Sequence, residues 1–196
     1  MSQPIKILAF AGSSRIESFN KKLVKIAAEA AKSAGAEVTY LDFLDYPMPL
    51  FNEDLEAQDG LPESVRQFQA LLSSHQGFLI ACPEYNGSIT PLLKNAIDWA
   101  SRPTSELPRL ACFQGKVAAL MATSPGGLGG LRGLVHVRAI LDGIGTLVIP
   151  RQKAIPNAYQ VFDDQGLLKD ERQLADVEGL AQELVTVATK LNRSLS

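Results

Sequence analysis

The sequence predicts an α/β fold in which helices cover both faces of one parallel, doubly wound sheet. Five short apolar runs alternate with five segments whose apolar residues recur at helical spacing. The runs contain few polar residues, which is typical of strands that are buried on both faces. Right-handed crossovers between successive strands then place helices on both sides of the sheet. The length of 196 residues suits a single domain over residues 1–196.

Turn and capping signals set the expected boundaries. We expect strands at residues 5–10, 37–41, 77–82, 116–122 and 145–149. We expect helices at residues 18–34, 62–72, 90–100, 128–141 and 170–192. Gly35 and Gly143 act as helix stop signals, and Pro91 stands at a first helical position, where proline is favoured. The proline-containing stretch 42–60 is expected to be a loop, and its apolar part 46–51 fits a lid, an interface or a substrate wall.

The composition excludes several classes of protein. A net charge of −2 without a long run of either sign argues against a nucleic-acid groove or a basic membrane-surface helix. The apolar run 7–11 is too short for a signal peptide, and no stretch approaches the roughly 20 apolar residues of a membrane span. Cys82 and Cys112 show no CxxC pattern and, with two histidines, do not make a zinc site. We therefore expect a cytoplasmic protein with reduced thiols, without a metal, a nucleic-acid partner or a membrane partner.

The loop after the first strand has the properties of a phosphate site. Ligands of doubly wound sheets bind beyond the carboxyl ends of the strands, and this loop, AGSSRIESFN at 11–20, opens a helix there. Helix N-termini attract anions through their free N–H groups and their dipole. The side chains that can add hydrogen bonds to a phosphate are Ser13, Ser14, Arg15, Ser18 and Asn20. The alternative interpretation is an ordinary helix N-cap with incidental serines.

Two further loops on the same edge suit a flat ligand. PEYNGSIT at 83–90 combines the aromatic Tyr85 with an Asn86–Gly87 pair that favours positive φ and turns backbone N–H groups outward. TSPGGLGG at 123–130 has four glycines within five residues, which lets a ligand approach the backbone closely. The alternative interpretations are an ordinary turn at 83–90 and a flexible connection at 123–130. Because GxxxxGK[ST] and GxGxxG are absent, the edge fits a mononucleotide better than a nucleoside triphosphate or a dinucleotide.

Three segments resemble the NADPH-dependent FMN reductase family, which includes quinone, chromate and azo-dye reductases. They are GSSRIESFN, PEYNGSITPLLKNAIDWASRP and SPGGLGGLRGLVHVR, and the resemblance runs from the first strand to about Pro150. It implies a flavodoxin-like fold with strand order 2-1-3-4-5 and FMN as cofactor. It also implies NADPH or NADH as electron donor, a ping-pong reaction, and a quinone, chromate, an azo compound or free flavin as the small-molecule acceptor. The family further implies a homodimer or homotetramer.

The resemblance also implies roles for individual residues. The FMN phosphate would be held by Ser13, Arg15, Ser18 and Asn20. The isoalloxazine ring would be lined by Pro83, Glu84, Tyr85, Asn86 and Gly87, and closed on its other side by Ser124, Gly126 and Gly127. No side chain is expected to act as a catalytic acid or base, because the flavin carries the chemistry. Two positions depart from the family pattern: Ser14 replaces a common leucine, and Thr90-Pro91 stands where Pro-Gly is frequent.

Three other functions compete with this interpretation. A serine hydrolase would need a histidine beside Ser13 or Ser14, yet His75 is expected about 20 Å from the ligand edge and His136 about 12 Å from it. A flavodoxin-type electron carrier would need a strongly acidic docking face, which a net charge of −2 disfavours. An interaction protein without flavin would not need three ligand-type loops. Trp99 fits either a subunit interface or the core.

Overall fold

In the computed structural model, which describes residues 3–195 and side chains up to residue 192, one parallel sheet forms the centre of the molecule. Its strands are β1 (Lys6–Ala11), β2 (Glu37–Leu41), β3 (Gly77–Ala81), β6 (Val117–Thr123) and β7 (Leu147–Ile155). The strand order is β2-β1-β3-β6-β7, which confirms the predicted order 2-1-3-4-5 when only the strands of this sheet are counted. Every pair of neighbouring strands in this sheet is parallel.

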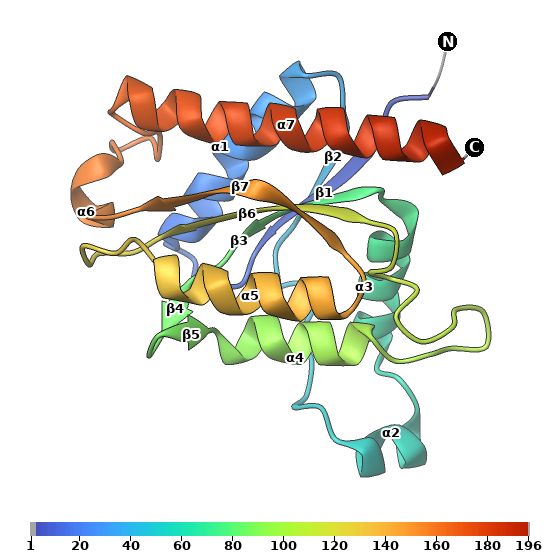
Figure 1. The fold of residues 1–196 in the computed structure, drawn as a ribbon. Helices are drawn as coiled ribbons and strands as arrows, with labels where there is room; N and C mark the ends of the chain where they lie inside the picture. Colours follow the sequence, from blue (N-terminus) through green and yellow to red (C-terminus); the bar gives the residue numbers. More distant parts are fainter. Residues whose placement is uncertain (1–2, 196) are drawn as a thin grey trace.

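Helices cover both faces of the sheet, as predicted (Figure 1). One face carries α1 (Phe19–Ser33) and α7 (Glu171–Leu195), and the other carries α3 (Glu63–Ser74), α4 (Pro91–Ala100) and α5 (Leu131–Gly143). Two hydrophobic cores result, because successive side chains of a strand point to opposite faces. In β1, Ile7 packs in the core under α1 and α7, whereas Leu8 packs in the core over α3, α4 and α5.

The last strand is longer than predicted, because β7 continues past Pro150 to Ile155. The prediction ended this strand at Ile149, and the residue that follows is a proline, which cannot donate to a sheet ladder. The structure accommodates Pro150 in a bulge between two stretches of regular pairing with β6. Arg138 of α5 satisfies the bulged carbonyls, and its guanidinium lies 3.3, 3.0 and 3.4 Å from the oxygens of Val148, Ile149 and Pro150.

Replacing Arg138 with methionine is expected to destabilise the protein by about 1–3 kcal/mol, because carbonyl oxygens of the bulge lose a charged donor. Urea denaturation followed by circular dichroism measures the change. Arg109→Met is the control, since Arg109 is an exposed loop residue. Equal stability of the two variants would mean that the bulge does not depend on Arg138.

Four short elements lie where none was expected. The predicted loop 42–60 contains α2 (Glu53–Asp59), which buries no residue and therefore has no apolar periodicity to reveal it. The segment after β3 forms a small separate hairpin, β4 (Glu84–Tyr85) and β5 (Ser88–Ile89), and α6 (Ala158–Val161) follows β7. In addition, α5 begins at Leu131 instead of residue 128, because two preceding glycines adopt positive φ.

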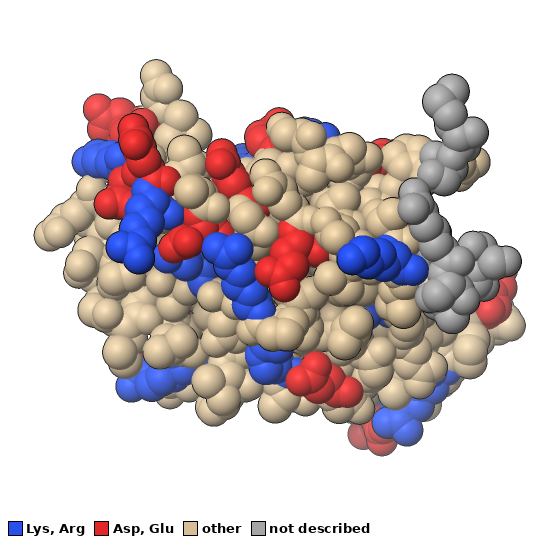
Figure 2. Space-filling model, turned by 45° about the horizontal axis from the view of Figure 1, so that its top comes forward, with Lys and Arg blue, Asp and Glu red and all other residues tan. Residues whose placement is uncertain are grey.

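The surface carries charges of both signs. Figure 2 shows basic and acidic side chains interspersed on the face that comes forward when the α7 side is tilted toward the viewer. Within the described part of the chain, no helix is long and apolar enough to cross a membrane.

Candidate functional site at the carboxyl edge of the sheet

The three loops predicted to bind a ligand meet at one edge of the sheet and are bonded to one another. The loop after β1 lies against β3 and α4, because Gly12 N donates to Ala81 O at 2.9 Å and Thr90 Oγ1 donates to Gly12 O at 2.7 Å. Asn20 joins α1 to the end of β6: its amide nitrogen donates to Thr123 O at 2.9 Å, and its amide oxygen accepts from Thr123 N at 3.1 Å. The edge is therefore one connected unit.

The loop after β1 leaves hydrogen-bond donors at the start of α1. Ser18 caps the helix, and its Oγ accepts from Lys21 N at 3.4 Å, so its hydroxyl hydrogen can still be donated to a ligand. Ser13 is nearly buried, and its Oγ accepts from Arg15 N at 3.3 Å. Arg15 is exposed and forms no ion pair within residues 3–192. An exposed cation beside a helix N-terminus is well suited to bind an anionic group.

Asn20 is the predicted phosphate residue whose side chain is already engaged. Both polar atoms of its amide bind the backbone of Thr123, and the residue is 5 % exposed. We assign it a positioning role, since it holds the first turn of α1 against β6. Asn20 stands two residues after the cap residue Ser18, and nothing in the local sequence indicated that its partner would be Thr123, which is 103 residues away.

The hairpin turn has the conformation that its Asn-Gly pair predicts. Asn86 and Gly87 have φ values of 51° and 80°, and they connect the only two residue pairs of β4 and β5. Tyr85 is 52 % exposed beside them. The turn therefore presents a backbone edge and an aromatic side chain to the outside of the sheet.

The side chain of Glu84 binds the N-terminal part of α5. Its carboxylate accepts from the backbone N–H groups of Arg132 at 3.0 Å and Gly133 at 3.3 Å, and from Arg132 Nε at 2.7 Å. It thereby caps a helix whose own N-cap residue, Gly130, has no side chain to do so. Burial would raise the pKa of the Glu84 carboxyl, but the bonds and charge of Arg132 and the Gly133 N–H outweigh it and lower the pKa. Arg132 was missed by the sequence reasoning, because nothing local to it signals this pairing.

The glycines after β6 fall into two kinds. Gly129 and Gly130 have positive φ, and a Cβ on them would lie 2.5 Å from the backbone of Ile155 and 2.7 Å from the Cβ of Ala122, respectively. Packing within the chain therefore requires both. Gly126 and Gly127 are exposed, and a Cβ there would meet only Ser124 Oγ at 3.9 Å or nothing within 4 Å. This open backbone at the ligand edge is a cradle that a flat group can fill.

Neither histidine is bonded to Ser13 or Ser14, although His136 reaches the edge loop 83–90, which corrects the expected distance of about 12 Å between this residue and the edge. His75 is buried at the other end of β3, where its ring nitrogens lie 2.6 Å from Leu71 O and 2.9 Å from Thr39 Oγ1, and burial lowers its pKa. His136 lies 2.8 Å from Ser88 Oγ, on the α5 side of the hairpin. A serine hydrolase with Ser13 or Ser14 as nucleophile therefore lacks its base.

The thiol beside the site is inert. Cys82 is fully buried, and burial raises its pKa far above the usual range. Cys82 therefore packs as a small hydrophobic residue.

The apolar segment 46–51 is held by α4. Asn95 accepts from Phe51 N and donates to Pro49 O, both at 2.8 Å, and Trp99 Nε1 also donates to Pro49 O at 2.8 Å. Trp99 is fully buried, so its place is in the core of this chain. Because its backbone is anchored in this way, the segment 46–51 is not expected to act as a lid. An interface and a substrate wall remain as interpretations, and Leu50, which is 78 % exposed, is available for either role.

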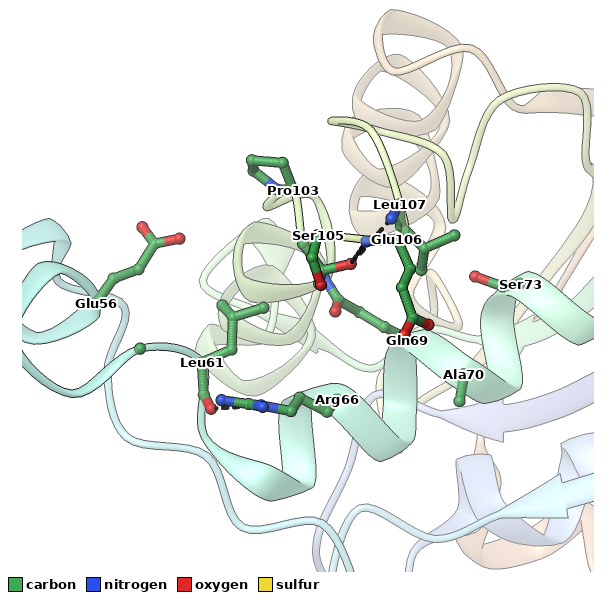
Figure 3. Close-up of a pocket in the computed structure, with 12 residues that line it drawn as sticks. Glu56, Leu61, Arg66, Gln69, Ala70, Ser73, Pro103, Ser105, Glu106 and Leu107 are labelled. Carbon is green, nitrogen blue, oxygen red and sulfur yellow. Dashed lines mark hydrogen bonds between the residues drawn. The ribbon is translucent and has the colours of Figure 1, made fainter.

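A hollow of about 690 Å³ lies elsewhere, between α3 and the segment 103–107 (Figure 3). Two of its polar groups are used internally: Arg66 Nε donates to Leu61 O at 3.0 Å, and Thr104 Oγ1 accepts from Leu107 N at 2.9 Å. No residue of the three edge loops lines it. A second hollow, of about 860 Å³, runs along α1 and reaches the edge at residues 16–18.

Comparison with known proteins agrees with this geometry. The family model described as NADPH-dependent FMN reductase matches residues 5–160. The chain is 37 % identical over 196 residues to an NAD(P)H:quinone oxidoreductase of Solanum tuberosum, covering 97 % of this chain and 96 % of the relative. It is 36 % identical over 173 residues to an NAD(P)H-dependent FMN reductase of Pseudomonas aeruginosa, covering 88 % and 89 %. Among solved structures, the flavoenzyme NAD(P)H:(acceptor) oxidoreductase FerB of Paracoccus denitrificans superposes with a TM-score of 0.80 at 30 % identity, covering 95 % of this chain and 98 % of that one.

Proposed function

Because this chain belongs to the NADPH-dependent FMN reductase family, we propose that it reduces a quinone with electrons from NADPH or NADH. The chain is an oxidoreductase of the FMN and quinone reductase type, with a flavodoxin-like fold, FMN as cofactor and NAD(P)H as donor. The quinone is our first choice of acceptor, since the potato relative is named for that reaction. Chromate, azo compounds and free flavin are further acceptors of the same proposal.

The observation that carries the proposal is the open glycine backbone at 126–127. It faces outward at the edge where the unpaired Arg15 and the Asn86–Gly87 turn also lie. In our proposal Ser13, Arg15 and Ser18 hold the FMN phosphate, with Asn20 behind them. The 83–87 segment and residues Ser124, Gly126 and Gly127 enclose the ring. FMN bound there would supply hydride-acceptor and electron-donor chemistry, and we propose that both substrates use this one site in a ping-pong order.

The net charge of −2 supports an enzyme over an electron carrier, which would dock through a strongly acidic face. We also propose a homodimer or homotetramer. The apolar side chains Tyr85, Leu128, Leu131 and Val135 are 43–58 % exposed near the edge, which is typical of an interface.

Two unbridged cysteines support our proposal of a cytoplasmic location.

A visible spectrum tests the proposal directly. The purified protein is expected to bind added FMN, to lose the visible flavin absorbance when NADPH is added anaerobically, and to regain it rapidly with a quinone. Binding without bleaching by either nicotinamide nucleotide would favour the carrier. Failure to bind FMN at high concentration would favour the interaction protein.

Arg15→Ala is expected to weaken FMN binding about tenfold or more, because a charge-assisted bond to phosphate contributes about 1.5–3 kcal/mol. The KM for NADPH should change less. Fluorescence titration of FMN and steady-state kinetics measure the two effects, with Arg109→Ala as control. An equal loss for both ligands, or no loss, would contradict the assignment of the loop after β1.

A further inference from the structure

The hairpin of β4 and β5 cannot hold its own position. It has only two residue pairs and forms a sheet separate from the central one. An isolated two-stranded hairpin is marginally stable in water even when it is longer. Whatever fixes the Asn86–Gly87 turn must therefore come from another element.

That element is the N-terminal part of α5. Gly133 allows the approach, since a Cβ there would lie 3.3 Å from Ser88 O and 3.4 Å from Glu84 Cβ. Ser88 Oγ lies 2.8 Å from His136 Nδ1, which adds a bond one turn further along the helix. The Glu84 carboxylate makes the densest set of contacts, since it accepts from two backbone N–H groups and from the Arg132 guanidinium. The Glu84 side chain is 8 % exposed, whereas that of Arg132 is 62 % exposed.

We propose that Glu84 is a positioning residue that fixes the 85–88 turn on α5, so that the turn stands ready for the flavin ring. This inference rests on the proposed function and revises one part of it: the Glu84 carboxylate faces α5 and does not contact the cofactor. The Glu84 carboxylate has two effects: it neutralises the positive N-terminal end of α5, and it holds the hairpin in place. A preorganised turn avoids the loss of conformational freedom that a loose turn would undergo on binding.

A charged carboxylate is needed for this arrangement. Glutamine at position 84 would keep one acceptor oxygen but would place an NH2 group against the donors of Arg132 and Gly133. Alanine would remove all the contacts and leave the two N–H groups without their cap. The expected order of FMN affinity is therefore wild type, then Glu84→Gln, then Glu84→Ala. Arg132→Met, which keeps the backbone cap, should fall between wild type and Glu84→Ala.

Hydrogen exchange of the protein without FMN, read by mass spectrometry, tests the positioning role independently of activity. Glu84→Ala should raise exchange at 84–89 and 131–134, while peptides from β1, β3 and β6 stay protected. The Kd for FMN should rise tenfold or more. Glu29→Gln is the control, because Glu29 is an exposed residue of α1 paired only with Lys32. Far-ultraviolet circular dichroism establishes that each variant is folded, and Glu84→Gln serves if Glu84→Ala is not.

The inference is overturned if Glu84→Ala binds FMN as tightly as wild type. It is also overturned if affinity falls while hairpin exchange is unchanged, since Glu84 would then act as a direct ligand. The proposed function fails separately, if the wild-type protein itself binds no FMN. Increased exchange in the unliganded variant would still support the docking of the hairpin in that case.

Discussion

Gly129→Ala is expected to lower the free energy of unfolding by more than about 4 kcal/mol, through overpacking and backbone strain together. The new Cβ would lie 2.5 Å from the carbonyl carbon of Ile155 and 2.7 Å from the nitrogen of Pro156. These atoms cannot yield easily, because Ile155 O accepts from Ser124 N at 3.3 Å and from Thr123 Oγ1 at 2.9 Å. The φ of 61° adds roughly 1 kcal/mol for any residue with a Cβ. Urea denaturation measures the loss.

Gly127→Ala is the matched control for the same loop. Its Cβ would meet nothing within 4 Å, so stability is expected to stay within about 1 kcal/mol of wild type. FMN affinity should nevertheless fall, because the methyl group would occupy the cradle. If Gly127→Ala unfolded as readily as Gly129→Ala, the loop would pack differently from our description. If it bound FMN normally, the ring would have to lie elsewhere.

Trp99→Ala is expected to cost about 3–5 kcal/mol, the range for truncating a large buried aromatic side chain. Trp99 is fully buried, packs edge-on against Phe51 with ring centroids 4.9 Å apart, and donates to Pro49 O. Trp99→Phe should cost only about 1–2 kcal/mol, since Pro49 O keeps the bond from Asn95. Denaturation measures stability, and limited proteolysis should show faster cleavage within 46–56 in Trp99→Ala. Dissociation of an oligomer without a loss of monomer stability would instead place Trp99 at an interface.

The sheet and its order were predictable because buried parallel strands have a strong local pattern. Residues 5–10, 77–82 and 116–122 are nearly continuous apolar runs, and all three form strands of the sheet, whereas 37–41 forms a half-exposed strand at its edge. β7 was predicted only up to its proline, since the side chain that makes the bulge tolerable, Arg138, comes from a neighbouring helix. The exposed helix α2 had no apolar stripe to detect. Sequence patterns thus predict elements that are regularly buried. They do not predict an element, such as the end of β7, whose irregular backbone depends on a side chain from another part of the chain.

The candidate site divides in the same way. The types of residue in the three loops, and their position after strands, were enough to predict a phosphate and a flat ring at one edge. The Asn86–Gly87 turn followed from intrinsic backbone preference, which acts between neighbours in the chain. The different tasks of Gly127 and Gly129, and the engagement of Asn20 and Glu84 with backbone groups, could not be foreseen.

Residue type and spacing were thus sufficient for the fold class, and the three family motifs were sufficient for the cofactor family. Which side chains remain free for a ligand was settled by packing between segments far apart in the chain. A carboxylate or an amide binds the donors nearest in space, and for Glu84 those donors lie 48 residues away, on α5. Sequence patterns describe periodicity and immediate neighbours, so such long-range hydrogen bonds become visible only once the helices are folded onto the sheet.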